Sequence, residues 1–277
     1  MAWMAWAATY NIVHGEDDIG VWVSRGGDYG AAMVADGVSA TGGGGASFLA
    51  VSSMIIACRR LLAGGLSFTT MRECLRLVDM VARETVVEDA AIVAEIKKLY
   101  YKDCSKEGEP CTKPLGVDDV MRIGYVEPTE QGGEGAPSST LLAALFSGSN
   151  IGFMLLGDGV VMSTGATAKR EELWVAWGAL PQFYQGVRVV RYVALGEGAR
   201  GHPVLLLADS EPGRVYVVAT DGVDPAALAE ALNTIVNQVE DMVERGANPA
   251  AELLKQVRAR TGRLEDDASI ALVYHRS

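Results

Sequence analysis

The sequence predicts an α+β fold in which helices cover stacked antiparallel sheets. Short apolar runs follow one another closely with only turn residues between them, which is typical of antiparallel strands. Apolar patterns of helical period occur in two blocks, one before the long run of strands and one after it. The chain has 277 residues, 49% of them hydrophobic, so its length suffices for one large core. We therefore predict a single domain over residues 1–277.

Three strands are expected at the start of the chain. The first thirteen residues carry no charge and are interpreted as a buried strand. They have neither the basic start nor the long apolar core of a signal peptide. Further strands are expected at Ile19–Val23 and Ala31–Ala35, and the glycine-containing stretch 25–28 supplies the turn between them.

Two helices are expected next. Apolar residues recur at helical spacing, as core packing requires, at Phe48, Val51, Ile55, Cys58 and Leu62. Thr70 and Glu73 have the spacing of a capping box and predict the start of a second helix. The helical pattern continues, less clearly, to about Tyr101.

The stretch 103–137 differs from its surroundings because it is rich in Gly, Pro, Lys and Glu. We interpret it as a connecting excursion and favour a plain surface loop over a loop that touches a substrate. Its two cysteines, Cys104 and Cys111, can in principle form a local disulfide. A cytoplasmic location argues against that bond.

The second half of the chain is expected to hold most of the strands and two more helices. A hairpin is predicted from Leu141–Phe146, Ile151–Leu156 and the four polar or glycine residues between them. Later strands are predicted at Val160–Ser163, Trp174–Trp177, Val187–Leu195, Val204–Ala208 and Val215–Ala219. Helices are predicted after Asp224-Pro225, ending at Gly246, and after Asn248-Pro249, ending at Gly262. A last strand is expected at Ile270–Tyr274.

Composition excludes several function classes. The net charge is −11 and no block of basic residues occurs, so nucleic-acid binding is not expected. No apolar run appears long enough to span a membrane, so no membrane association is expected and the predicted location is the cytoplasm. Neither Cys-x-x-Cys nor His-Glu-x-x-His spacing occurs, which excludes the common structural zinc sites.

Acidic residues stand at the edges of predicted strands throughout the chain. Asp36-Gly37, Asp158-Gly159 and Asp221-Gly222 each follow an apolar run. Acidic groups precede two other apolar runs, at Glu16, Asp17 and Asp18 and at Asp266 and Asp267. Asp-Gly is also a common turn pair, so ordinary turns in a protein of another function are the alternative. Five such sites nevertheless suggest one shared carboxylate cluster, which is costly unless a cation neutralises it. A carboxylate-rich, His-poor site favours hard cations.

These segments resemble, in order, the motifs of the type 2C metal-dependent Ser/Thr protein phosphatases. The matching stretches are Gly-Glu-Asp-Asp at 15–18, Val-Ala-Asp-Gly at 34–37, Pro-Ser-Ser-Thr at 137–140, Leu-Gly-Asp-Gly at 156–159, Ala-Thr-Asp-Gly at 219–222 and Glu-Asp-Asp-Ala-Ser-Ile at 265–270. The resemblance implies a four-layer α/β/β/α sandwich with two divalent cations, Mg²⁺ or Mn²⁺, at one end. It also implies hydrolysis of phosphoserine or phosphothreonine in a phosphorylated protein substrate, by a water that the cations activate.

The resemblance assigns a role to each acidic residue. Asp36 would bridge both cations, and Asp221 and Asp266 would complete the shell of one. Glu16 and the carbonyl of Gly37 would hold the other cation. The third metal position or the surrounding shell would involve Asp17, Asp158 and Asp267.

One departure concerns the phosphate. The family usually has an Arg four residues before the Glu, and this chain has Ile12 there. His14 or Arg25 could substitute, but the sequence leaves the phosphate-binding residue unknown. A further departure reduces the family's Gly-Asp-Ser-Arg stretch to Gly-Asp-Gly-Val at 157–160. A non-catalytic phosphatase-like domain that binds a partner is therefore the alternative function.

Overall fold

A computed structural model of the chain describes residues 2–11, 14–38, 44–85, 93–94, 96–98, 100–101, 104, 108–115, 136–165, 174–176, 182–184, 187–189, 192–194, 196, 198–200 and 203–276. Ile12, the larger part of the excursion at 103–137 and the glycine-rich residues 39–43 lie outside the described part of the chain. Every statement of structure below refers to the described residues.

Two five-stranded antiparallel sheets form the centre of the fold. The first has the order β1-β15-β14-β7-β8, and its strands are Ala2–Tyr10, Ala268–Arg276, Arg214–Ala219, Val160–Gly165 and Trp174–Ala176. The second has the order β13-β6-β5-β3-β2, and its strands are Val204–Asp209, Asn150–Leu156, Leu141–Ser147, Tyr29–Ala35 and Asp18–Val23. Small sheets are formed by β9 and β10 (Gln182–Tyr184, Val187–Val189) and by β12, β11 and β4 (Gly198–Arg200, Tyr192–Ala194, Ser138–Ser139).

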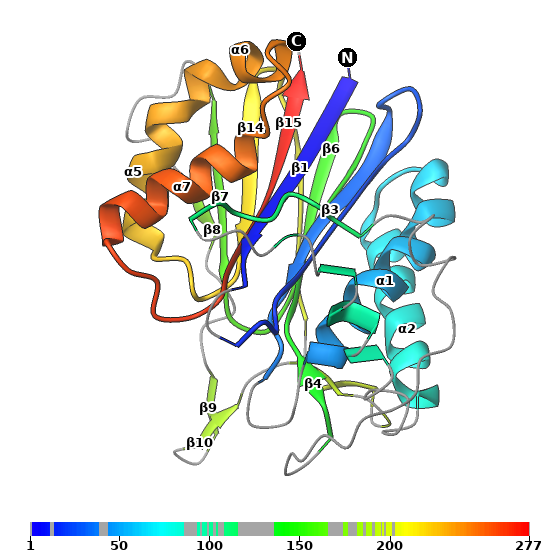
Figure 1. Cartoon of the computed structure of the whole chain (residues 1–277). Helices are drawn as coiled ribbons and strands as arrows, with labels where there is room; N and C mark the ends of the chain where they lie inside the picture. Colours follow the sequence, from blue (N-terminus) through cyan, green and yellow to red (C-terminus); the bar gives the residue numbers. More distant parts are fainter. Residues whose placement is uncertain are drawn as a thin grey trace.

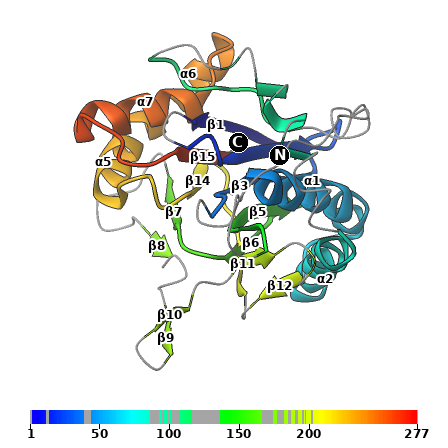
Figure 2. The same ribbon diagram turned by 60° about the horizontal axis from the view of Figure 1, so that its bottom comes forward.

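Helices cover the outer face of each large sheet (Figures 1 and 2). The β1 sheet is covered by α5 (Pro225–Ile235), α6 (Val239–Glu244) and α7 (Pro249–Thr261). The β13 sheet is covered by α1 (Gly44–Leu61) and α2 (Phe68–Glu84). A third apolar cluster fills the space between the sheets, with Trp3, Phe146 and Val218 among its members. The fold is thus the predicted α+β, four-layer α/β/β/α sandwich.

Most predicted elements are present, and the differences have local causes. The α2 helix begins at Phe68, and Ser67 caps it by accepting a hydrogen bond from the backbone N–H of Thr70, so the capping box predicted at Thr70 and Glu73 is wrong. The helix predicted from Asp224 to Gly246 is interrupted by a 3₁₀ turn at Val236–Gln238. The strand predicted at Val187–Leu195 is two separate strands, β10 and β11. The described residues between 93 and 101 are helical, as expected.

The α1 helix corrects one expectation about apolar runs. Together with the following 3₁₀ turn, Gly44–Gly64 is long and apolar enough to cross a membrane by length and hydropathy alone. However, 67% of its most apolar window is buried inside the domain, as expected for a core helix between a sheet and α2.

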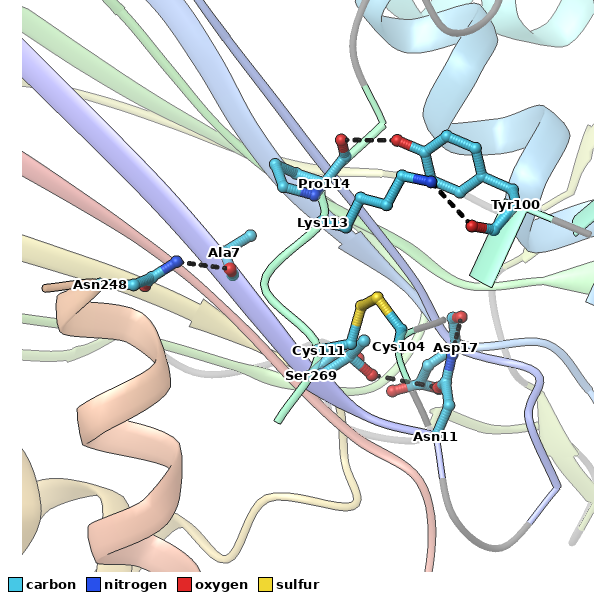
Figure 3. Close-up of a disulfide and its surroundings, with 11 residues drawn as sticks. Ala7, Asn11, Asp17, Tyr100, Cys104, Cys111, Lys113, Pro114, Asn248 and Ser269 are labelled. Atoms are coloured by element: carbon cyan, nitrogen blue, oxygen red, sulfur yellow. Dashed lines mark hydrogen bonds between the residues drawn. A yellow bond between two sulfur atoms is a disulfide. The ribbon is translucent and has the colours of Figure 1, made fainter. Parts of the chain in front are cut away.

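All four cysteines are paired. Cys58 of α1 is bonded to Cys74 of α2, and Cys104 is bonded to Cys111 (Figure 3). The cytoplasmic argument against the second bond is therefore contradicted. Backbone hydrogen bonds join Cys111 to Thr9 in both directions, and Leu115 is bonded to the edge of β2. Because Cys111 and Leu115 are buried, this described part of the excursion is not the plain surface loop that the composition suggested.

Candidate functional site

Strand register brings the acidic segments to one end of the sandwich. In the second sheet Ala35, directly before Asp36, pairs with Asp18, and Leu141 pairs with Leu156, two residues before Asp158. In the first sheet Ala219, two residues before Asp221, pairs with Ile270. Because the strands are antiparallel, the ends of β3, β6 and β14 and the starts of β2, β5 and β15 share one edge. The five acidic sites, far apart in sequence, therefore meet there.

The backbone at Asp36 is fixed by the segment 138–140. The backbone N–H of Thr140 donates to the Asp36 carbonyl at 2.8 Å, and the Ser139 hydroxyl donates to the same oxygen at 2.9 Å. In the other direction the Asp36 N–H donates to the Thr140 hydroxyl at 2.9 Å. Gly37 forms an isolated β-bridge with Ser139 and is buried. These bonds fix the backbone of Asp36, and its side chain lies beside Asp17 and among the other carboxylates.

Asp17 is fully buried beside Asp36 and is held by polar side chains that lie at the end of the first sheet. One of its carboxylate oxygens, Oδ2, accepts a hydrogen bond from the Thr220 hydroxyl at 3.0 Å, and its carbonyl accepts one from the Asn11 amide at 2.8 Å. The other carboxylate oxygen, Oδ1, has no hydrogen-bond partner in the described structure. Ser269 joins the same network by donating its hydroxyl to Thr9 (Figure 3). A buried carboxylate oxygen without a partner is costly and fits a site that receives a cation.

The Asp221 turn and the Asp266 loop are in close contact because Gly222 has no side chain. A β-carbon at this position would overlap the carbonyl oxygen of Asp267. Gly159 has a similar role, since it adopts a φ of 152° and its missing β-carbon lets the Asp158 turn pack against the carbonyl of Ala219. The glycines of the Asp158-Gly159 and Asp221-Gly222 pairs therefore bring acidic turns close together.

Asp267 faces the loop at 14–16. Its carboxylate accepts hydrogen bonds from the backbone N–H groups of His14, at 3.2 and 3.3 Å, and of Glu16, at 2.9 Å. The His14 ring lies near Asp266, with 3.9 Å between Nε2 and Oδ1. Asp267 thus anchors the loop that carries Glu16.

Crowding of the carboxylates changes their proton affinities. Burial, together with the charges of Asp221, Asp266 and Asp158, raises the pKa of Asp36 to about 7. Burial and the neighbouring Asp36 raise the pKa of Asp17 well above its ordinary value. At neutral pH this end of the sandwich therefore holds protons that a bound cation would displace.

The side chains are not pre-arranged as a closed metal cage. Within the described residues, no three His, Cys, Asp or Glu side chains lie close enough together to hold a cation without adjustment. Arg25 follows β2 at the end of the strand away from Asp18, so it lies far from the acidic edge. Of the two predicted substitutes for the family's Arg, only His14 lies beside this cluster.

Several supporting residues of the site, among them Thr140, Thr220, Ser47 and Lys97, were not predicted from the sequence. Thr140 accepts a hydrogen bond from the Asp36 backbone, and Thr220 donates one to the Asp17 carboxylate. Ser47 and Lys97 contact the Asp18 carboxylate. Thr140 and Thr220 lie inside the segments that carry the resemblance, which was the available signal, and Ser47 follows the glycine-rich stretch after Asp36-Gly37. Lys97 had none, because its position depends on how the segment after α2 packs.

Comparison with known proteins agrees with this architecture. The sequence model of the family described as Protein phosphatase 2C matches residues 10–259. The serine/threonine phosphatase PstP/Ppp of Mycobacterium tuberculosis has a similar fold, with a TM-score of 0.57 and 15% identity over 100% of both chains. A structure of the catalytic domain of the serine/threonine protein phosphatase PstP in complex with two manganese ions gives a TM-score of 0.55 at 15% identity, covering 99% of each chain. The serine/threonine phosphatase of S. agalactiae gives 0.54 at 15% identity, covering 98% of this chain and 99% of its own. A search of curated protein sequences finds no match.

Proposed function

Because this chain belongs to the protein phosphatase 2C family, we propose that it is a metal-dependent phosphatase that removes phosphate from serine or threonine in proteins. The observation that carries the proposal is the convergence of five acidic segments at one end of the sandwich, around a half-buried Asp36 whose pKa is raised to about 7. Such an accumulation of carboxylates is unfavourable by itself and becomes favourable when cations occupy it.

The donor set fits two Mg²⁺ or Mn²⁺ ions, since it consists of carboxylate and carbonyl oxygens. In this proposal Asp36 would be a ligand of both cations. Asp221 and Asp266 would complete the ligands of one cation, and Glu16 and the Gly37 carbonyl those of the other. Asp158 would lie near a third, weaker position. Asp17 and Asp267 are not ligands in this proposal: Asp17 packs beside Asp36, and Asp267 anchors the backbone of the loop that carries Glu16.

When bound, the two cations lower the pKa of a coordinated water and orient the phosphate for in-line attack. The protein's own contribution is to hold the ligands. Thr140 and Ser139 fix the Asp36 backbone, Thr220 orients the Asp17 carboxylate, and Asp267 fixes the loop of Glu16. His14 stands at the rim of the cluster, where a substrate phosphate would enter.

A non-catalytic, partner-binding domain is the second candidate, and the observation that favours it is Ile12 in place of the family's Arg. Loss of a bidentate phosphate contact weakens substrate positioning more than metal chemistry. Both candidates therefore predict that the protein binds metal, but only the phosphatase is expected to release phosphate.

The test is phosphate release from a panel of phosphoserine and phosphothreonine peptides with added Mn²⁺ and with EDTA. The proposal predicts release that needs Mn²⁺, is abolished by EDTA and is nearly lost in Asp221→Asn. Asp209→Asn is the matched control, because it removes the same charge at the far end of β13, where Asp209 pairs with Asn150. Mn²⁺ binding without release would support the partner-binding domain instead.

A further inference from the structure

A buried ion pair lies directly beneath the loop that carries Glu16. The Nζ of Lys97 is 2.8 Å from Oδ2 of Asp18, and the two side chains are 5% and 0% exposed. Removing two charges from water is expensive, and a buried pair of this kind often contributes no net stability compared with apolar residues of the same size. The pair therefore calls for an explanation other than stability.

Ser47 connects this ion pair to the two loops of the candidate metal site. Its hydroxyl oxygen lies 2.6 Å from Oδ2 of Asp18, 2.5 Å from the carbonyl oxygen of Glu16 and 3.0 Å from that of Gly44. Lys97 donates a further hydrogen bond to the same hydroxyl at 3.2 Å. Lys97 contacts Asp18 at the start of β2 and Ser47 in the first turn of α1, and Ser47 in turn contacts the backbone of Glu16. The ammonium group therefore helps to fix these three segments relative to one another.

Lys97 also lies close to the side chain of Glu16. A β-carbon added to Gly44 would be 3.9 Å from Glu16 Cγ and 3.9 Å from Lys97 Nζ, so both groups border the same small space. Because Lys97 is buried, it cannot reach a phosphate on a protein substrate. Its effect on the site must pass through Asp18, Ser47 and Glu16.

We propose that Lys97 is a positioning residue that holds Glu16 in place for the second cation. This inference rests on the proposed metal-dependent function. Groups that orient metal ligands typically change metal affinity 10- to 100-fold when they are removed. A second effect has the opposite sign, because deleting a nearby positive charge would by electrostatics alone strengthen cation binding. The direction of the change therefore separates positioning from simple charge.

The experiment is calorimetric titration of Mn²⁺ into the folded, metal-free protein at one fixed pH. We expect Lys97→Met to weaken one of the two Mn²⁺ binding steps, the one that Glu16 is proposed to support, about tenfold. Lys255→Met is the matched control. Lys255 lies on α7 and forms an ion pair with Glu109, so this variant removes the same charge and should leave the Mn²⁺ affinity unchanged. Tighter binding by Lys97→Met would overturn the proposal and leave Lys97 as a nearby charge only.

A double variant keeps the test valid if Lys97→Met does not fold. Asp18→Asn with Lys97→Met leaves no unpaired buried charge and has the same net charge as the wild type. We expect the double variant to bind the second Mn²⁺ about tenfold more weakly as well. At saturating Mn²⁺ it should reach the kcat of the wild type, with an unchanged substrate KM. A double variant with wild-type Mn²⁺ affinity would refute the positioning role.

The proposed function can fail separately from this inference. If the wild type binds Mn²⁺ but releases no phosphate, the phosphatase proposal fails, while the affinities still test Lys97. If the wild type binds no Mn²⁺, both proposals are overturned.

Discussion

Gly222 lies against the carbonyl oxygen of Asp267 so closely that a β-carbon on residue 222 would overlap it. This contact joins the turn after β14 to the loop before β15, and these carry Asp221 and Asp266. Two carboxylates that repel each other are thereby held on neighbouring turns by backbone packing. The geometry of the site depends on the absence of one methyl group.

Gly222→Ala should therefore reduce both stability and metal binding. Inserting a methyl group into a tightly packed contact costs about 1–3 kcal/mol. Urea unfolding of the metal-free protein measures the loss, and Mn²⁺ titration measures the effect on the site. Gly64→Ala is a suitable control, because nothing lies within 4 Å of a β-carbon at residue 64. Equal stability of Gly222→Ala and Gly64→Ala would contradict the contact.

The raised pKa of Asp36 predicts an unusual pH dependence of the metal-free protein. With a pKa of about 7, folded Asp36 keeps its proton while the unfolded residue has lost it, so this group stabilises the fold at low pH. That contribution is lost as the pH rises through 7. Between pH 5.5 and 7 the change amounts to about 2 kcal/mol.

Comparison with Asp36→Asn measures this effect together with the change it causes in the neighbouring Asp17, whose pKa Asp36 raises, since the remaining titrating groups are common to both proteins. Unfolding free energies measured in EDTA at pH 5.5 and pH 8.0 should show the wild type losing stability relative to Asp36→Asn. A constant difference between the two proteins would mean that Asp36 titrates normally.

His275 should act in the opposite direction at acidic pH. Its ring is buried, is stacked on Trp3 with 4.1 Å between the ring centroids, and has Nδ1 2.9 Å from the Ser210 hydroxyl. Burial lowers the pKa of His275, so the folded protein resists charging it. Stability from this group is complete above the ordinary His pKa of about 6.5 and decreases below it. His275→Gln should flatten the loss of stability between pH 6.5 and 5, and an unchanged slope would exclude this role.

The Cys58–Cys74 bond should contribute measurably to stability. It joins α1 to α2 across a sequence separation of 16 residues. Closing a loop of about 15 residues is worth about 3 kcal/mol in the chain-entropy description. Unfolding of Cys58→Ala/Cys74→Ala should show a loss of this order, and alkylation of the denatured, unreduced wild type should find no free thiol. Free thiols in that assay would contradict the pairing.

The sequence predicted the layers of this fold well because they depend on periodicity and turns. The strands around Asp36 and Asp221 are bounded by Asp-Gly pairs, and the Asp224 cap and Pro225 fix the start of α5. The start of α2 at Phe68 and the 3₁₀ turn at Val236–Gln238 were missed because they depend on local packing and not on composition.

The acidic cluster could be predicted, but its supporting residues could not. The repeated Asp-Gly pairs at strand ends indicated one cluster. That Asp36 and Asp158 share an edge depends on the order β6-β5-β3, and their approach to Asp221 depends on the stacking of the two sheets, which the pattern does not give. Lys97 approaches Asp18 only through the tertiary packing of the segment after α2. The disulfide at Cys104 was judged from the expected compartment and not from geometry, and that argument was wrong.

The most direct test of the account compares the melting of wild type, Asp36→Asn and Asp209→Asn with and without Mn²⁺, by calorimetry at one fixed pH. A cation that binds only the folded state adds RT ln(1 + [L]/Kd), about 2.7 kcal/mol at one hundred times Kd. We predict a clear rise in Tm with Mn²⁺ for wild type and Asp209→Asn, and little or none for Asp36→Asn. Equal Mn²⁺-induced shifts in all three proteins would contradict the metal site at its centre.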